Sequence, residues 1–212
     1  MASTTVDLDV VQAGPGAGAS AAPAAPHAVF FYDLASPDCY LVAERIRAEL
    51  PVVCEWEPVD AAALALPDGT GRRGERSDPE RLAARAAALE LLPLRLPVIW
   101  PPDSALALRV ATYAKAAGKS IAYSLAAFRQ AFAGGRDLGE EATVLLAAAA
   151  CEIHPTAALK GAALKTTAAA LAGAGERARA AGVPALPAFA LADGLITSGP
   201  GALEDALAAL SG

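Results

Sequence analysis

Histidine, cysteine and aromatic residues are scarce in this 212-residue sequence, which has two histidines, three cysteines and an aromatic fraction of 5%. The histidines, His27 and His154, stand far apart, and neither lies in a pattern that indicates a Ser-His-Asp triad. The cysteines and histidines lack the spacing of zinc ligands, so we expect no metal site. The sequence also has no glycine-rich phosphate loop between a strand and a helix.

Positive charge is scarce as well. The formal net charge is −6 and the pI is about 4.9, and a nucleic-acid binder needs a basic surface. No apolar run approaches the ~20 residues of a membrane-spanning helix, and the first residues lack the basic and apolar regions of a secretory signal. The odd number of cysteines (Cys39, Cys54 and Cys151) in a chain without such a signal indicates reduced thiols and a cytoplasmic protein.

Alanine accounts for much of the hydrophobic fraction of 55%. Alanine favours helix but buries little area per residue, so we expect closely packed helices with few large anchors. Residues 1–27 are rich in Ala, Gly, Pro and Ser. Such a segment buries too little surface to offset the entropy of ordering, and we predict a disordered tail.

The pattern of apolar residues, prolines and turn signals predicts a mixed α/β chain. Strands are expected at residues 29–32, 51–58, 188–192 and 195–197, with a hairpin turn at Asp193-Gly194. Helices are expected at residues 37–49, 78–91, 104–117, 120–133, 139–153, 155–174, 176–181 and 201–210. The order is βαβ, then a run of helices, then αββα.

The segment Ser36-Pro37-Asp38-Cys39 follows the first strand and opens the first helix. Serine is a good N-cap and proline is favoured at the first helical position. The N-terminus of a helix presents unpaired N–H groups and partial positive charge, which stabilise a thiolate. The spacing is that of a C-x-x-C redox motif with serine in place of the first cysteine. From these residues alone, Ser36 is most simply the N-cap of this helix.

Four segments together resemble the DsbA-like branch of the thioredoxin fold, and within it the 2-hydroxychromene-2-carboxylate isomerases and kappa-class glutathione transferases. Ser36–Cys39 resembles their S-P-Y-S motif, and residues 182–189 (GVPALPAF) resemble G-V-F-G-V-P-T-F, whose second proline is cis. Trp100-Pro-Pro-Asp103-Ser104 resembles W/F-P-P-N-S. Residues 128–137 resemble a helix that ends in F-x-E-G-R-D. The resemblance covers residues 28–210.

This resemblance implies a thioredoxin-like fold of residues 28–61 and 173–212, with an inserted all-helical domain at residues 62–172. It implies an isomerase or transferase that uses glutathione, with Ser36 facing the sulfur and with Leu186, Pro187 and Ser198 contacting the cofactor. Trp100 and Asp103 would contact a small-molecule substrate. A homodimer is expected from the same families, and no nucleic acid or membrane partner is expected.

Several positions depart from the families' pattern. Gly199-Pro200-Gly201-Ala202 stands where the kappa family has G-S-D-R, and proline removes a backbone donor there. Asp38 replaces an aromatic residue and Asp103 replaces an asparagine, which places negative charge near the expected ligand. Two alternatives therefore remain: a disulfide oxidoreductase that uses Cys39 alone, and a diverged binding or scaffold domain.

The alternation of apolar residues also predicts the core of the sheet. We expect it to contain Val29, Phe30, Phe31, Val52, Val53, Trp56, Phe189 and Leu191, with the first strand between two neighbours and the helices of residues 78–172 outside it.

Overall fold

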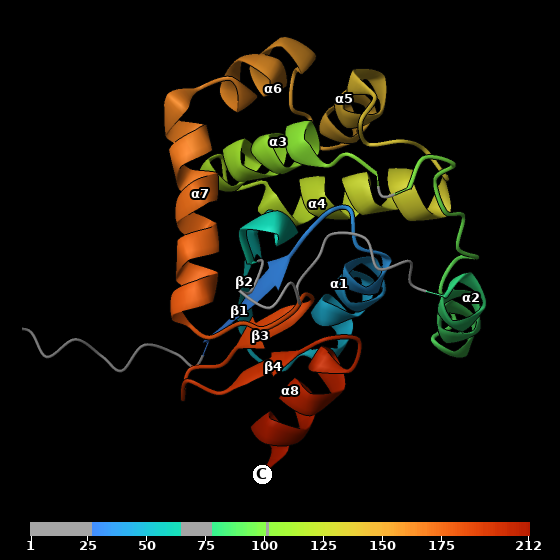
Figure 1. The fold of residues 1–212 in the computed structure, drawn as a ribbon, viewed down its shortest axis with the longest axis vertical. Helices are drawn as coiled ribbons and strands as arrows, with labels where there is room; N and C mark the ends of the chain where they lie inside the picture. Colours follow the sequence, from blue (N-terminus) through green and yellow to red (C-terminus); the bar gives the residue numbers. More distant parts are fainter. Residues whose placement is uncertain (1–26, 65–77, 101) are drawn as a thin grey trace, which may run out of the picture.

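A computed structural model describes residues 27–64, 78–100 and 102–212 (Figure 1). Most of the predicted disordered tail and the loop before residue 78 lie outside these residues. The elements are β1 (His27–Tyr32), α1 (Pro37–Glu49), β2 (Val53–Pro58), η1 (Ala61–Leu64), α2 (Pro79–Ala88), α3 (Ala105–Ala116), α4 (Ser120–Phe128), η2 (Arg129–Ala133, a π-helical turn), α5 (Glu141–Ala150), α6 (Pro155–Ala162), α7 (Lys165–Ala180), β3 (Ala188–Ala190), β4 (Ile196–Ser198) and α8 (Ala202–Ser211).

The four strands form one sheet in the order β2-β1-β3-β4. β1 pairs in parallel with β2 and antiparallel with β3, and β3 and β4 form a hairpin. The predicted βαβ start, the C-terminal ββα unit and the central place of the first strand are thereby confirmed. Because Phe31 pairs with Ala188, Pro187 lies beside the end of β1, where the chain turns toward α1.

Alternation along β1 divides the core between the two faces of the sheet. Phe30 and Tyr32 are fully buried on one face, where they stack at 5.2 Å between ring centroids and contact α1, α3 and α4 through one hydrophobic cluster. Phe31 belongs to a second cluster on the opposite face, with Ala174 and Ala178 of α7. The sheet therefore lies between two layers of helices (Figure 1).

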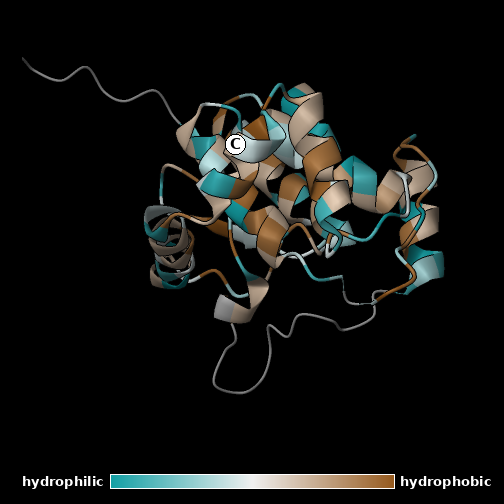
Figure 2. Ribbon diagram, turned by 90° about the horizontal axis from the view of Figure 1, so that it is seen from above, coloured by the Kyte–Doolittle hydropathy of each residue, from teal (hydrophilic) through white to brown (hydrophobic). Residues whose placement is uncertain are grey.

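The inserted helices share the larger cluster with the sheet and do not have a separate core. Leu108 of α3 and Phe128 of α4 are fully buried in the same cluster as Phe30. The Tyr32 hydroxyl also forms a 2.5 Å hydrogen bond with the Ser124 hydroxyl of α4. Pale brown, which marks weakly hydrophobic residues, is frequent along the helices in Figure 2.

One expectation about the core of the sheet was wrong. Val53 was expected in the core, but its side chain is 72% exposed. It begins edge strand β2, in which burial is confined to the last three residues. The remaining members of the predicted core are buried or half-buried.

The predicted helix at residues 155–174 is two helices, α6 and α7, with a break at Leu164. The Thr167 hydroxyl donates to the Gly161 carbonyl at 2.7 Å and so satisfies a group that a continuous helix would use for a backbone bond. Gly161 itself packs against the Tyr113 ring, where a Cβ atom would lie 2.3 Å from Cδ2. Close contact between α6 and α3 therefore leaves no room for a larger side chain at position 161.

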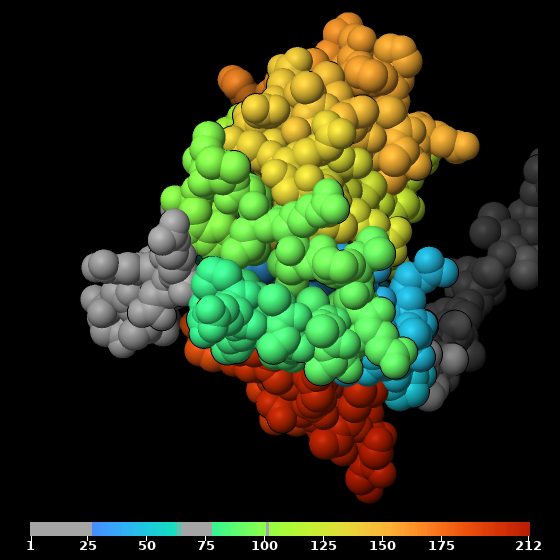
Figure 3. All heavy atoms as spheres, turned by 90° about the vertical axis from the view of Figure 1, so that its right-hand side faces the viewer, coloured from blue at the N-terminus to red at the C-terminus, as the bar shows by residue number. Residues whose placement is uncertain are grey.

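Helix α2 and the segment that follows it cross one side of the molecule between the helical layer and α8 (Figure 3). α2 buries Leu82 and Ala86 and leaves most of its surface in solvent. Within the described ranges, no single helix is long and apolar enough to cross a membrane. α5 and α6 pass that test only when taken together across a bend of 117°.

Candidate active site

Ser36 caps α1 in the way that its sequence predicted. Its backbone is extended, and its Oγ accepts a hydrogen bond from the Cys39 N–H at 3.2 Å. The Ser36 N–H donates to the Asp33 carbonyl at 3.1 Å, which closes the turn between β1 and α1. Ser36 is half-buried, whereas Pro37, Asp38 and Cys39 are buried. Among the four residues of the motif, the serine is therefore the most accessible.

The Cys39 side chain is fully buried. Burial raises the pKa of its thiol to about 12, and hydrogen bonds with the Ser36 hydroxyl and the Asp33 backbone offset only part of this effect. A thiolate is the reactive form of cysteine, so this thiol is poorly suited to nucleophilic attack. The contact between Ser36 and Cys39 also indicates that positions 36 and 39 stand in the geometry of a C-x-x-C pair.

Asp33 ties the turn that carries Ser36 to two other parts of the molecule. Its carboxylate is 1% exposed and accepts hydrogen bonds from the Ala35 N–H at 2.9 Å, the Ala61 N–H at 2.8 Å and the Ser104 hydroxyl at 2.9 Å. These donors belong to the turn itself, to η1 and to the start of α3. A buried carboxylate with several donors strongly constrains the segments that it joins.

The Leu186-Pro187 peptide bond is cis. Pro187 is buried and directly precedes β3, and Leu186 is half-buried against both hydrophobic clusters. The Pro187 carbonyl accepts a hydrogen bond from the Gly199 N–H at 2.8 Å. The structure thus brings the cis-proline segment to the end of β1 and joins it to the loop that follows Ser198.

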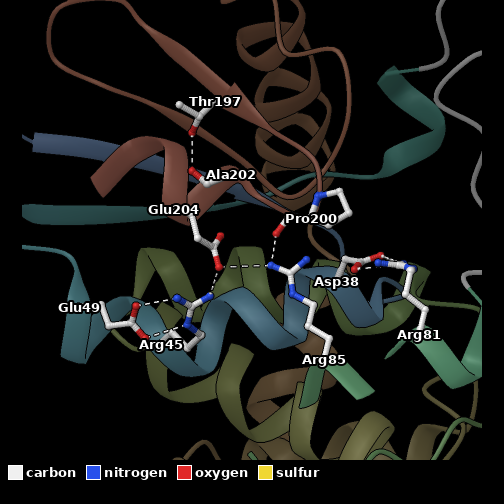
Figure 4. A network of polar contacts seen from close by, with 9 residues as sticks. All are labelled: Asp38, Arg45, Glu49, Arg81, Arg85, Thr197, Pro200, Ala202 and Glu204. Atoms are coloured by element: carbon white, nitrogen blue, oxygen red, sulfur yellow. Dashed lines mark hydrogen bonds and ion pairs between the residues drawn. The ribbon is translucent and has the colours of Figure 1, made fainter. Parts of the chain in front are cut away.

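Two arginines of α2 reach the segments around the site (Figure 4). Arg81 pairs with Asp38 at 3.3 Å. One helical turn later, Arg85 donates to the Pro200 carbonyl and lies 3.5 Å from Glu204. The positive charges of α2 therefore lie beside Asp38 and beside the loop of residues 199–202, which lacks the serine and aspartate of the kappa family.

Trp100 and Asp103 lie in the segment between α2 and α3. The Asp103 carboxylate lies before the N-cap residue of α3, Ser104, and accepts from the Ala105 N–H at 2.9 Å. Trp100 is half-buried against the larger cluster, and its indole Nε1 is buried with no hydrogen-bond partner in the described structure. Ser104 brings the end of this segment to the β1–α1 turn through Asp33.

Comparison with known families decides the assignment of the fold. Residues 28–210 match the family of DsbA-like thioredoxin domains. The chain belongs to this family. No curated protein sequence matches it significantly.

Several solved structures superpose over most of the chain. A 2-hydroxychromene-2-carboxylate isomerase has a TM-score of 0.74 at 16% identity, covering 87% of this chain and 94% of that one. A probable DsbA oxidoreductase from Streptomyces coelicolor has a TM-score of 0.67 at 20% identity, covering 88% of each chain. The cytosolic disulfide reductase DsbM from Pseudomonas aeruginosa, also solved with GSH, has a TM-score of 0.58 at 16% identity, covering 87% and 97%. At these identities the likeness establishes the DsbA-like thioredoxin fold.

Sequence reasoning missed Asp33, Arg81 and Arg85. Asp33 could have been identified from the sequence, because it is a charged residue directly after an apolar strand, and the neighbouring residues are buried. The arginines carried no such signal, since their partners lie 43 and 115 residues away in the chain. In the part of the chain that the structure describes, no three His, Cys, Asp or Glu side chains gather as metal ligands would.

Proposed function

We propose that this DsbA-like protein binds a thiol cofactor of the glutathione type at the N-terminus of α1, with Ser36 beside the cofactor's sulfur. The observation that carries the proposal is the contrast within the motif: Ser36 is partly accessible at the helix end, and Cys39 is fully buried. A hydroxyl donor and a helix N-terminus both stabilise a thiolate. The motif is therefore better suited to holding an external thiolate than to supplying one.

The cis-proline segment would hold the peptide part of the cofactor. Leu186 precedes β3 and would pair its backbone with an extended ligand, as in strand addition. Ser198 is half-buried at the end of β4, and the hydrogen bond between Gly199 and Pro187 keeps the two segments together. The register of β1 and β3 puts the cis-proline segment beside the end of β1, where the turn to Ser36 begins.

Arg81 and Arg85 would supply the positive charge that a glutathione carboxylate needs. The Arg81 side chain is 43% exposed while it pairs with Asp38, so a ligand can reach it. The pairing also offsets the negative charge that Asp38 places near the sulfur. Arg85, bonded to the Pro200 carbonyl, lies at the loop in which Gly199–Ala202 replaces the families' serine and aspartate.

The chemistry proposed is isomerisation of a small conjugated carbonyl compound, or transfer of the thiol to such a compound. The cofactor's thiolate adds to the substrate's double bond, and the resulting enolate rotates about the new single bond. Expulsion of the thiolate then restores the double bond in the other geometry, with no net oxidation. Ser36 would stabilise the thiolate before addition and after expulsion, and the substrate would lie toward Trp100 and Asp103.

The same proposal places the protein in the cytoplasm, where thiols stay reduced. The three cysteines are unpaired in the structure, which is consistent with such a compartment.

Calorimetric titration with glutathione tests this function. We expect saturable binding, weakened by Arg81→Gln, while the exposed control Arg136→Gln binds normally. In an isomerase assay Ser36→Ala should lower the rate about 10- to 150-fold, the loss of one charge-assisted hydrogen bond, and Cys39→Ser should keep most of the rate. Absence of binding would support the scaffold alternative, and a requirement for Cys39 would support the oxidoreductase.

A further inference from the structure

An apolar surface lies on the segment that follows α2. Leu92 is 61% exposed, Val98 is 98% exposed and Ile99 is 62% exposed. The other large hydrophobic residues that are exposed in the described part of the chain occur singly, on separate elements. Apolar side chains scattered over a surface are normal in a monomer, whereas several together mark an interaction site.

Helix α2 adds an uncharged outer face to this surface. Leu82 and Ala86 form its buried side, and its two arginines turn toward Asp38 and Pro200 (Figure 4). At 3.6 residues per turn, the positions that point away from the buried side are one glutamate and four alanines, all of them exposed: Glu80, Ala83, Ala84, Ala87 and Ala88.

An outer face of this composition is unusual for a helix that meets only water, which carries charged and polar residues on that side. The distance between two packed helices depends on the side chains at their contact. The four alanines therefore allow a second helix to approach α2 closely. Together, the outer face of α2 and residues 89–99 form what we call the α2 surface.

Two opposite charges on the α2 surface have no ion-pair partner in the described ranges. Glu90 and Arg95 are both exposed, and they stand on either side of Leu92 in the chain. Arg95 is anchored by its backbone, because its N–H donates to the Phe132 carbonyl at 2.7 Å. Its side chain is thus presented from a fixed position.

This pair of charges makes the α2 surface complementary to itself. In a two-fold symmetric interface the same surface is used by both copies, so that one residue meets a second residue of the partner and the reverse contact also forms. A glutamate and an arginine on one surface can then pair twice across the axis. The partner that fits this surface is therefore a second copy of the same chain.

The extent of the α2 surface agrees with an interface between two proteins. A stable interface takes about 800 Å² from each partner, which is more than three aliphatic side chains supply. In Figure 3, α2 and the segment after it form a band across one face of the molecule. The alanine face thus extends the apolar segment toward the size that a dimer needs.

We propose that this protein forms a two-fold symmetric dimer through the α2 surface. Leu92, Val98 and Ile99 pack against the same surface of the partner, and each Glu90 pairs with the partner's Arg95. The arginines that reach Asp38 and Pro200 lie on another side of α2, so the dimer leaves the site proposed around Ser36 free. The two proposals are independent of each other.

Sedimentation velocity of the full chain over a wide range of concentration tests this association. We expect a species of twice the chain's 21.2 kDa that becomes more abundant as the concentration rises. Leu92→Lys should weaken association at least about tenfold, because an ammonium group would enter an apolar interface. Leu164→Lys is the matched control and should leave association unchanged, since Leu164 is 50% exposed at the break between α6 and α7, away from α2 (Figure 1).

Exchange of the two charges tests the symmetry of the contact. Glu90→Arg and Arg95→Glu should each weaken the dimer about 2- to 30-fold, because the dimer contains this exposed pair twice. An equal mixture of the two variants should associate more tightly than either variant alone, since every pair across the mixed dimer then has opposite charges. Such recovery cannot arise from a loss of folding.

A protein that stays monomeric at every concentration would overturn the proposal. A dimer that Leu92→Lys leaves intact would also overturn it. A mixture of Glu90→Arg and Arg95→Glu chains that associates no better than either variant alone would contradict the pairing of Glu90 with the partner's Arg95, and with it the two-fold arrangement.

Discussion

Replacing Asp33 with asparagine should destabilise the protein strongly, although the two side chains have nearly the same shape. The Asp33 carboxylate uses its two oxygens to accept from Ala35, Ala61 and Ser104. An amide has one oxygen. In one orientation of the asparagine side chain, this oxygen still accepts from Ala35 and Ser104. The NH2 group then faces the Ala61 N–H, and two donors cannot form a hydrogen bond with each other.

The magnitude follows from this count of donors. The part-buried Ala61 N–H loses its acceptor, which costs about 1–2 kcal/mol, and the two hydrogen bonds that survive lose the strength that an ionised acceptor provides. We therefore expect a loss of about 2–4 kcal/mol. Ser104→Ala removes a single donor and should cost about 1.5 kcal/mol. The double variant should cost less than the sum, because the two residues share one network.

Urea unfolding followed by circular dichroism measures these losses, with an unchanged slope as the sign that only stability has changed. Asp193→Asn is the matched control, since the Asp193 carboxylate accepts a hydrogen bond from Leu195 in an exposed turn. It should change stability by less than about 0.5 kcal/mol. If Asp33→Asn were as stable as this control, Asp33 would not hold the β1–α1 turn in the way described.

Three further predictions follow from individual contacts. Gly161→Ala should destabilise the protein by about 1–3 kcal/mol, because the added methyl group overpacks against the Tyr113 ring. Gly173→Ala meets only the flexible end of an arginine and should stabilise α7 by about 0.5–1 kcal/mol. Equal shifts in the melting temperature of the two variants would contradict the contact between Gly161 and Tyr113. The raised pKa of the Cys39 thiol means that stability should be intact below pH 9 and should fall as the pH rises toward 12; Cys39→Ala should flatten this fall in urea titrations at several pH values. Ser36→Cys should create a pair with Cys39 that loses two thiols under a mild oxidant, and an unchanged thiol count would mean that positions 36 and 39 do not form a C-x-x-C geometry.

The elements of the fold could be predicted well where local signals and topology agree. Ser36-Pro37 begins α1 as expected, because an N-cap and a proline at the first helical position act within one turn. The Asp193-Gly194 turn joins β3 and β4, because glycine accepts a backbone φ of 88° at no steric cost. Signals of this kind depend on neighbouring residues, so the sequence alone contains them.

Tertiary contacts decided what the sequence did not reveal. The break between α6 and α7 lies beside the close packing of Gly161 against Tyr113, and these two residues are 48 positions apart in the chain. The exposure of Val53 depends on its place on an edge strand, which alternation of apolar residues does not encode. The arginines of α2 became candidates only when the fold placed them beside Asp38 and Pro200.

The thiol pKa of bound glutathione tests the central proposal most directly, because it measures what Ser36 and the N-terminus of α1 do to the sulfur. The ultraviolet absorbance of the thiolate can be followed against pH in the complex with the unmodified protein and with Ser36→Ala. We predict that bound glutathione ionises at a lower pH than free glutathione, and that Ser36→Ala raises its pKa by about 1–2 units, the equivalent of one charge-assisted hydrogen bond. A bound thiol with the same pKa in both proteins, or in the free and bound states, would contradict the proposed role of Ser36.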